Sequence, residues 1–177
     1  MKKIVVFTGA GISAESGLGT FRDSGGLWEE YKIEDVATPS AFDKNPVMVL
    51  DFYNIRRKQL IATKPNAAHF SLNKLDAIFD LSIITQNIDD LHERSGSKKI
   101  LHLHGKLMEA RSTMDNTIYP LHKADLNIGD TCIKGGQLRP NVVWFGEDVP
   151  NMSIAIEEVE SADIFLIIGT FGHRRYY

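Results

Sequence analysis

The chain has 177 residues, which is enough for one domain with a buried core and one small inserted module. Charged residues make up 24% of the chain and the formal net charge is −3, which argues against a general nucleic-acid or membrane-surface binder. The single cysteine, Cys132, excludes an intramolecular disulfide and a metal site built from several cysteines.

The apolar pattern contains neither a targeting segment nor a membrane span. The chain starts with Met1-Lys2-Lys3 and continues with four strongly apolar residues, which is too short for a signal peptide. No run approaches the ~20 apolar residues that cross a bilayer. We therefore expect a soluble, cytoplasmic protein with neither nucleic acid nor membrane as a partner.

Apolar runs and helical patterns alternate along the chain. In chain order, they predict a strand over 3–7, helices over 46–62 and from 65 to 78, a strand over 81–85, a short helix over 90–94, strands over 100–103 and 142–145, a helix over 151–161 and a strand over 164–168. Continuously apolar strands separated by helices are typical of a parallel sheet covered on both faces. The predicted fold class is α/β, a Rossmann-like parallel sheet with helices on both faces plus a small inserted lobe.

Two segments depart from this alternation. Residues 18–38 are polar and irregular, with Trp28 and Tyr31 as anchors, and so long a connection is usually functional or mobile. Residues 106–138 are polar with weak periodicity, and we interpret them as an inserted lobe. The predicted organisation is a nucleotide-binding domain over 1–105 and 139–177, interrupted by the lobe.

Two glycines follow the first strand directly. Gly9 and Gly11 allow a tight turn and present bare backbone N–H groups to a phosphate. If a helix starts here, its N-terminus adds attraction for an anion. The pattern Gly9-x-Gly11-x-x-Ala14 therefore indicates a site for a nucleotide pyrophosphate. A tight strand-to-helix turn without any ligand explains the same residues.

Polar residues also follow three later strands, at 86–90, 104–105 and 146–147. Ligands gather at the carboxyl ends of strands in open α/β sheets. Taken singly, Asn87 or Asp89 could cap the short helix, and His104 could be an ordinary hydrogen-bonded histidine. Because four such strand ends point at one crevice, we favour a binding site.

Six motifs together resemble the sirtuins, the Sir2 family of NAD-dependent protein-lysine deacylases. They occur in family order from residue 1 to about residue 173. The matching segments are 9–13 (GAGIS), 19–22 (GTFR), 85–89 (TQNID), 102–105 (HLHG), 138–147 (LRPNVVWFGE) and 168–170 (IGT).

The resemblance implies NAD as the cofactor. Backbone amides of Ala10, Gly11 and Ile12 would hold its phosphates, and Asn87 and Asp89 would line the nicotinamide pocket. The full set of cofactor-binding residues that it implies is Gly9, Ala10, Gly11, Ile12, Ser13, Thr20, Phe21, Arg22, Trp28, Gln86, Asn87, Ile88, Asp89, Gly169 and Thr170.

The resemblance also implies the reaction. The acyl oxygen of the substrate lysine attacks the ribose carbon as nicotinamide leaves, and the acyl group ends on ADP-ribose. His104 would be the general base on a ribose hydroxyl, with Asn87 and Asp89 completing the catalytic set. The implied partners are acylated-lysine proteins, whose backbone would pair as an added strand with the segment that contains Val142, Trp144 and Phe145. We interpret His102 as structural.

Two residues of the 46–62 helix suggest the kind of acyl group. Tyr53 and Arg56 match the pair that bacterial and mitochondrial sirtuins use for acidic acyl groups. Residues three apart share a helix face, a guanidinium binds a carboxylate through paired hydrogen bonds, and a phenol adds a donor. The prediction is removal of succinyl or malonyl groups, with acetyl as a further substrate. Alternatively, Tyr53 is core and Arg56 is a solvated surface charge.

The lobe departs from the sirtuins that hold a structural zinc with four cysteines. The chain has Arg111, Ser112 and Thr113 near the first cysteine pair and only Cys132 near the second. One thiolate does not make a closed tetrahedral site, so we expect a zinc-free variant. Apolar residues would hold the lobe instead, namely Met108, Ile118, Tyr119, Leu121, Leu126 and Ile133.

The family pattern also stops early. Where sirtuins continue past the match to Gly169-Thr170 with a cofactor-contacting serine and a further strand, this chain has Phe171 and then Gly172-His173, and its last four residues match nothing in the family. We expect an uncovered sheet edge and hydrophobic face, lower stability and weak NAD binding in this C-terminally truncated chain.

Three alternative functions are considered. A dehydrogenase needs an acidic residue at the end of a second strand, but Glu29 and Glu34 follow no apolar strand. An NAD-dependent ADP-ribosyltransferase would use the same cofactor, but Tyr53 and Arg56 argue against it. An inactive sirtuin remnant that at most binds NAD is compatible with the early end of the pattern.

Overall fold

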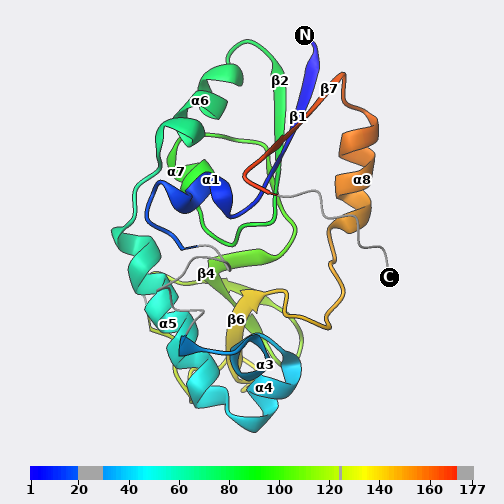
Figure 1. Ribbon diagram of the computed structural model, residues 1–177. Helices are drawn as coiled ribbons and strands as arrows, with labels where there is room; N and C mark the ends of the chain where they lie inside the picture. The colour runs from blue at the N-terminus through cyan, green and yellow to red at the C-terminus, as the bar shows by residue number, and fades with distance from the viewer. Residues whose placement is uncertain (20–29, 124, 171–177) are drawn as a thin grey trace.

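A computed structural model describes residues 1–19, 30–123 and 125–170 of the chain (Figure 1). Its elements form two regions, one around a parallel sheet and one around an antiparallel sheet. In chain order they are β1 (Lys3–Thr8), α1 (Gly11–Ala14), α3 (Ile33–Val36), α4 (Pro39–Lys44), α5 (Pro46–Ala62), α6 (Ala67–Leu75), β2 (Asp80–Thr85), α7 (Leu91–Arg94), β3 (Ile100–His102), β4 (Gly105–Ser112), β5 (Ile118–Pro120), β6 (Leu138–Val142), α8 (Met152–Glu160) and β7 (Ile164–Ile168).

The parallel sheet has the strand order β3-β2-β1-β7. The central strand β1 pairs with β2 on one side and β7 on the other, so that Val6 lies opposite both Ile83 and Leu166. All three pairings are parallel. The carboxyl ends of these strands therefore point to one edge of the sheet. The predicted α/β class with a Rossmann-like parallel sheet is confirmed.

Helices cover both faces of this sheet, and Figure 1 shows α6 and α8 on opposite sides of it. Alternate residues of β1 point to opposite faces because side chains in a strand alternate. Val6 packs with Leu72 of α6, whereas Val5 packs with Ala155 of α8. Full burial of one such aliphatic side chain stabilises the fold by about 1.5–3 kcal/mol, so both interfaces contribute to holding β1 in place.

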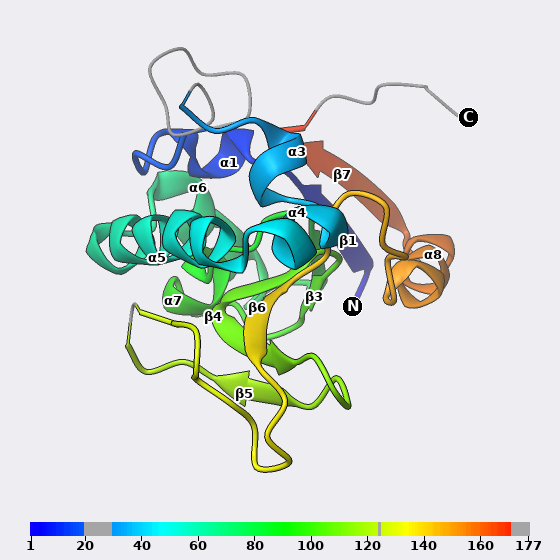
Figure 2. The same cartoon turned by 90° about the horizontal axis from the view of Figure 1, so that it is seen from below.

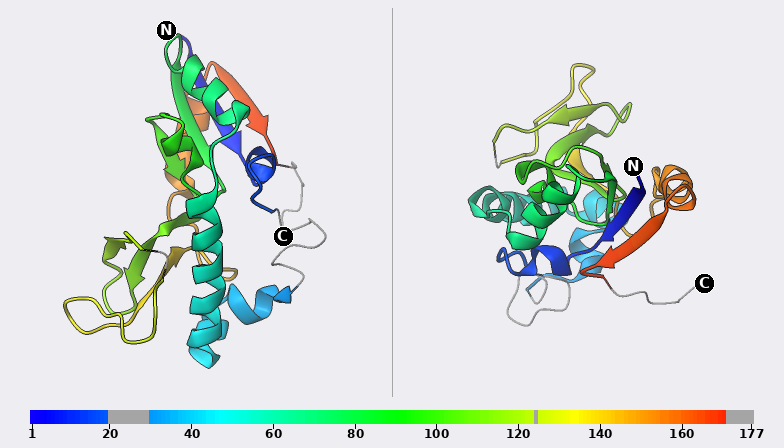
Figure 3. Two further views of the ribbon diagram at one scale, coloured as in Figure 1. Left: turned by 90° about the vertical axis from the view of Figure 1, so that its left-hand side faces the viewer. Right: turned by 90° about the horizontal axis from the view of Figure 1, so that it is seen from above.

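The second sheet is antiparallel, in the order β5-β4-β6 (Figure 2). Helix α5 packs against β4 and β6, and α3 and α4 pack beside α5 (Figure 3). The second sheet begins at Gly105 and ends at Val142, so it extends past the predicted lobe at both ends. The boundaries of that lobe, 106–138, stay a prediction.

The prediction of a strand over 142–145 in the parallel sheet is wrong. Val142 is the last residue of β6 and pairs with Gly105 in the antiparallel sheet. The segment then leaves the sheet and turns at Gly146, whose φ is +90°. The apolar run has another cause, since Val142 and Trp144 are buried in a core cluster with Phe52 of α5.

Most predicted helices are found within one residue of their expected ends. Helix α5 begins after Asn45, whose side chain accepts a hydrogen bond from the Met48 N–H at 3.2 Å. Helix α6 ends at Leu75, earlier than predicted, and Ile78 is 63% exposed instead of facing the core. The short helices α3 and α4 were not predicted, because four to six residues carry little periodic signal.

Strand β7 lies at an edge of the described sheet, and its side chains are only partly covered. The side chains of Ile164, Phe165, Leu166 and Ile167 are 36–55% exposed.

Within the described residues, no helix has both the length and the apolar composition that crossing a membrane requires.

Candidate functional site

The turn after β1 and the turn after β7 are packed directly against each other. The Gly11 N–H donates to the Gly169 carbonyl at 2.8 Å, and the Gly9 N–H donates to the Ile168 carbonyl at 3.1 Å. A Cβ on Gly9 would lie 2.6 Å from the Cβ of Thr170, and one on Gly169 would lie 2.2 Å from the Ile12 nitrogen. Glycine is required at both turns because the backbones approach so closely.

Two of the three backbone N–H groups that are predicted to bind phosphate already donate to backbone carbonyls. The Gly11 N–H is used by Gly169, and the Ile12 N–H donates to the Gly9 carbonyl at 3.1 Å. The Ala10 N–H takes part in neither bond. Phosphate binding by Gly11 and Ile12 therefore stays a prediction that requires these two bonds to open, whereas Ala10 needs no such change.

Three buried polar side chains form one hydrogen-bonded group at the end of β2. The Asn87 amide donates to the Ser13 hydroxyl at 3.2 Å and to the Gly9 carbonyl at 3.2 Å. The Ser13 hydroxyl donates to Asp89 Oδ2 at 2.9 Å. Ser13 thus links the two residues predicted to line the nicotinamide pocket, and it comes from the helix that follows the glycine turn.

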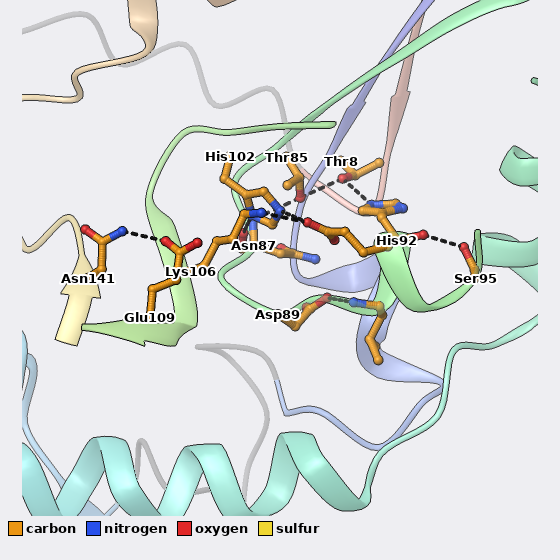
Figure 4. Close-up of polar contacts among 12 residues, drawn as sticks. Thr8, Thr85, Asn87, Asp89, His92, Ser95, His102, Lys106, Glu109 and Asn141 are labelled. Atoms are coloured by element: carbon orange, nitrogen blue, oxygen red, sulfur yellow. Dashed lines mark hydrogen bonds and ion pairs between the residues drawn. The ribbon is translucent and has the colours of Figure 1, made fainter. Parts of the chain in front are cut away.

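Asp89 is a buried carboxyl whose environment acts in two directions. Burial raises its pKa above the usual value, while hydrogen bonds from the Leu91 N–H and the Ser13 hydroxyl favour the ionised form and partly offset that effect. The Leu91 N–H lies 3.1 Å from Asp89 Oδ1, and Figure 4 shows this contact beside Asn87. The carboxyl is therefore held in one orientation by two donors.

His104 follows β3 and is oriented by the loop after β2. Its Nδ1 donates to the Gln86 carbonyl at 2.9 Å. This bond places the proton of the neutral ring on Nδ1 and leaves Nε2 as the acceptor. The Gln86 side chain in turn accepts a hydrogen bond from the Thr170 hydroxyl at 3.1 Å, which connects the loop to the turn after β7.

His102 lies two residues earlier and is buried. Its Nδ1 donates to the Asn87 carbonyl at 2.9 Å, and its Nε2 lies 2.9 Å from Glu93 Oε1. Lys106 also contacts Glu93, at 3.1 Å (Figure 4). Burial raises the pKa of Glu93, but the hydrogen bonds and charges of its neighbours, chiefly His102 and also Lys106, together outweigh it and give a pKa of about 2. The contacts agree with a structural role for His102.

A buried histidine pair beneath the site was not predicted from the sequence. His92 Nε2 donates to the Thr8 hydroxyl at 3.0 Å, and Thr8 donates to the Thr85 hydroxyl at 2.8 Å (Figure 4). The ring of His92 lies 5.0 Å from the ring of His69. Burial, with the neighbouring His69, lowers the pKa of His92 to about 4. No local sequence spacing reveals this group, because His69 and His92 come from α6 and α7 and the two threonines come from β1 and β2.

Tyr53 and Arg56 lie on α5 and differ in exposure. Tyr53 is only 2% exposed, and its hydroxyl accepts a hydrogen bond from Trp144 Nε1 at 3.0 Å. Arg56 is half-buried, and its guanidinium interacts electrostatically with both Tyr53 and Asp89. Burial raises the pKa of the Tyr53 phenol and lowers that of Arg56. The alternative is met in part, because Tyr53 does belong to a buried core cluster, whereas the half-buried Arg56 is not a fully solvated charge.

The predicted substrate segment divides into buried and exposed residues. Val142 and Trp144 are 6% and 2% exposed, whereas Phe145 is 55% exposed. The N–H groups of Val143, Trp144 and Phe145 already donate to the His104 carbonyl, the Glu147 carboxylate and the Ala37 carbonyl. Strand addition by a substrate therefore stays a prediction that must use other backbone groups, and Phe145 is the most exposed of the three predicted side chains.

Four predicted cofactor residues, Thr20, Phe21, Arg22 and Trp28, lie outside the described residues. The structure does bring together the others that the sequence placed at strand ends. Asn87, Asp89 and Ser13 form one group, and Gln86 joins His104 to Thr170. The roles assigned to these residues stay predictions.

The model of the Sir2 family matches residues 9–174, which is most of the chain. The chain belongs to the Sir2 family. A sirtuin of Helicobacter pylori strain J99, named NAD-dependent protein deacylase, is 54% identical over 171 residues, which cover 96% of this chain and 73% of that protein. A protein of the same name from Bacteroides thetaiotaomicron is 51% identical over 176 residues, covering 96% of this chain and 75% of its own.

Solved sirtuin structures share the fold. A Sir2 homologue variant in complex with ADP ribose has a TM-score of 0.89 at 43% identity and covers 96% of this chain and 70% of its own. A Sir2 homologue in complex with NAD has a TM-score of 0.86 at 44% identity and covers 96% of this chain and 68% of its own. Both of these solved structures hold NAD or its ADP-ribose part.

The lobe of this sirtuin does not offer the four cysteines of a family zinc site. Cys132 Sγ accepts a hydrogen bond from the Ser112 hydroxyl at 3.3 Å, and the Ser112 oxygen also accepts from the Met114 N–H at 3.1 Å. Residues 1–19, 30–123 and 125–170 contain no group of three or more His, Cys, Asp or Glu side chains that could hold a metal. The residues present therefore do not fit a closed tetrahedral zinc site.

Proposed function

We propose that this sirtuin removes acyl groups from lysine side chains of proteins with NAD as co-substrate, and that succinyl and malonyl groups are among its substrates. The observation that carries the proposal is the arrangement around the loop after β2. This loop holds His104 through the Gln86 carbonyl and joins Asn87 and Asp89 through Ser13. Relatives named NAD-dependent protein deacylase support the same activity.

NAD would supply the ribose carbon that accepts the acyl oxygen and the nicotinamide that leaves. The described residues suited to hold it are the Ala10 N–H at the glycine turn, the Gln86 and Thr170 side chains, and the Asn87–Asp89 group. The Asn87 amide gives both of its hydrogens to the Gly9 carbonyl and the Ser13 hydroxyl, so its oxygen and the Asp89 carboxyl are the groups left to accept from a carboxamide N–H₂ in fixed orientation.

His104 is the group in this site that can move a proton. With Nδ1 donating to the Gln86 carbonyl, Nε2 of the neutral ring is available to accept a proton from a ribose hydroxyl. The same bond fixes the plane of the ring, so little reorientation is needed when a hydroxyl arrives. Half-burial limits the access of water to the ring.

Tyr53 and Arg56 support recognition of acidic acyl groups. Both side chains come from one face of α5, and the positive guanidinium of Arg56 lies near Asp89 of the cofactor pocket. A carboxylate at the end of a succinyl chain would gain charge-assisted hydrogen bonds from Arg56 and a further bond from the Tyr53 hydroxyl. An acetyl group offers no such partner, so these two residues favour the longer acidic chain.

The experiment that tests the proposal is mass spectrometry of succinyl-lysine and acetyl-lysine peptides of one sequence, incubated with the chain and NAD. We expect loss of the succinyl group together with formation of nicotinamide and acyl-ADP-ribose. His104→Ala should slow this reaction by about 100-fold or more, since a general base contributes 10²–10⁴-fold. His122→Ala is the matched control, because His122 is exposed on the antiparallel region.

The outcomes separate the competing functions. Transfer of ADP-ribose to the peptide without loss of the acyl group would favour an ADP-ribosyltransferase. NAD binding without either reaction would favour the inactive remnant. Equal deacylation by wild type and His104→Ala would contradict the role given to His104.

A further inference from the structure

We propose that Trp144 is a positioning residue for acyl-group selectivity. Its indole N–H donates to the Tyr53 hydroxyl oxygen, and this bond directs the Tyr53 hydroxyl hydrogen toward the acyl carboxylate. The inference rests on the acidic-acyl specificity proposed above and adds a residue to it. It also adds the buried Trp144 to the residues that set substrate choice.

The contact itself is short and fully buried. Trp144 Nε1 lies 3.0 Å from the Tyr53 hydroxyl oxygen, and both residues are 2% exposed. A phenol hydroxyl has one hydrogen to donate and can also accept. Because an indole N–H only donates, the bond has one possible direction. Among the described residues this is the one hydrogen bond of the Tyr53 hydroxyl, so its hydrogen is directed away from Trp144.

Trp144 is fixed from several sides and does not adapt to its partner. The Arg139 guanidinium stacks 3.4 Å from the centre of the indole ring, and the ring of Phe42 lies 5.4 Å away. The Glu147 carboxylate accepts two hydrogen bonds from the Arg139 guanidinium, at 2.7 and 2.9 Å, and a third from the backbone N–H of Trp144 at 2.8 Å. The indole N–H therefore points at α5 from a rigid frame.

The environment keeps Tyr53 a donor. Burial raises the pKa of the phenol, so that it remains protonated at neutral pH, while the charge of Arg56 and the bond from Trp144 act against that rise. A donor to the phenol oxygen polarises its O–H bond and strengthens the bond that the hydroxyl can give to an anion. Trp144 thus sets both the direction and the strength of the Tyr53 donor.

The consequence concerns selectivity between acyl groups. A carboxylate at the end of an acyl chain would accept from the oriented Tyr53 hydroxyl and from Arg56, whereas an acetyl group ends in a methyl, which accepts no hydrogen bond. Removing the indole N–H frees the phenol to rotate, so the loss falls mainly on acidic acyl groups. Removal of the phenol oxygen should make the indole N–H irrelevant to this selectivity.

The test is a double-mutant cycle on the chain, with Tyr53→Phe, Trp144→Phe and the double variant. For each protein we would measure the dissociation constants of succinyl-lysine and acetyl-lysine peptides of one sequence by calorimetry. The ratio of the two constants reports selectivity, and a general loss of packing does not change it. Circular dichroism verifies that each variant is folded.

We expect Tyr53→Phe to lower the preference for the succinyl peptide by roughly 10-fold, since a hydrogen bond to a charged group is lost. Trp144→Phe should lower it about 3- to 10-fold. In the Tyr53→Phe background, Trp144→Phe should change the ratio by less than about twofold. Equal effects of Trp144→Phe in both backgrounds would overturn the inference.

Failure of the proposed specificity gives a different result. If the wild-type chain does not prefer the succinyl peptide, the acidic-acyl proposal is wrong and the inference is wrong with it. If Tyr53→Phe abolishes the preference and Trp144→Phe retains it, only the role of Trp144 is wrong. Should Trp144→Phe fail to fold, the indole N–H resonance of wild-type Trp144 decides: it should shift on binding the succinyl peptide more than on binding the acetyl peptide, and equal shifts would overturn the inference.

Discussion

At the scale of single residues, the buried His92 makes stability depend on pH. Its pKa is about 4 in the folded chain, below the value of about 6.5 expected after unfolding. Between these values the unfolded state binds more protons, so stability falls as pH decreases from about 6.5 to about 4. A further proton would sit on His92 Nδ1, which has no hydrogen-bond partner among the described residues.

We expect protonation of His92 to lower the unfolding free energy by up to about 3 kcal/mol as the pH falls from about 6.5 to about 4. Urea denaturation at a series of pH values measures it. His92→Gln should flatten the pH dependence, whereas His122→Gln, at an exposed position, should leave it as in the wild type. The same slope in all three proteins would show that other groups cause the acid sensitivity.

Gly169 joins the turn after β7 to the turn after β1. Gly169 has φ of +66°, and an added Cβ would lie 2.2 Å from the Ile12 nitrogen. Gly169→Ala should therefore cost roughly 3 kcal/mol or more, because a backbone clash adds to the cost of the left-handed conformation. The measurement is the free energy of unfolding in urea.

Gly129 supplies the matched control for this substitution. It has φ of +92°, but no atom lies within 4 Å of its added Cβ. Gly129→Ala should thus cost only the conformational term, about 1–2 kcal/mol. If the two substitutions cost the same, the close packing of the turns after β1 and β7 contributes little to stability.

At the scale of elements, polar bonds join separate parts of the lobe. The Gln137 side chain accepts from the Gly129 N–H at 2.9 Å and donates to the carbonyls of Asn127 and Asp130 at 3.0 and 3.1 Å. Ser112 and Cys132 are joined by a further bond. These contacts connect the loop between β5 and β6 to itself and to the end of β4.

We expect that EDTA leaves the melting temperature unchanged, whereas Gln137→Ala lowers stability by about 1–3 kcal/mol through loss of several hydrogen bonds. Differential scanning calorimetry with and without the chelator measures both effects. Gln59→Ala, at an exposed position of α5, is the control for loss of a glutamine side chain. A chelator-induced fall in melting temperature would contradict a metal-free lobe.

The elements also show what sequence patterns can and cannot predict. Strands β1, β2 and β7 were predicted because parallel strands covered by helices need continuous apolar runs. Strand β4 was missed because its buried and exposed residues follow no strict alternation and several are charged. The strand ends carrying Asn87 and His104 were predicted from topology. The bonds from His102 to Asn87 and from Trp144 to Tyr53 were not, because they depend on how separate elements pack.

At the scale of the whole molecule, β7 is the edge strand of the described parallel sheet and its side chains are partly exposed. An edge strand presents unpaired backbone groups, and apolar side chains beside them favour pairing with another chain. On β7 these are Phe165 and Ile167, which are 42% and 55% exposed, and Ile154 and Ile156 of the neighbouring α8 are about half exposed. The described surface therefore combines an edge strand with several exposed apolar side chains on β7 and α8.

We expect the 177-residue chain to associate in a concentration-dependent way, and sedimentation velocity measures this. Ile167→Lys should reduce association because it places a charge on the edge strand. Ile133→Lys is the control, since Ile133 is 95% exposed but lies on the lobe, away from the parallel sheet. If apolar exposure alone drove association, Ile133→Lys would have the larger effect. A larger effect of Ile167→Lys would instead identify the sheet edge as the contact, because the two substitutions add the same charge.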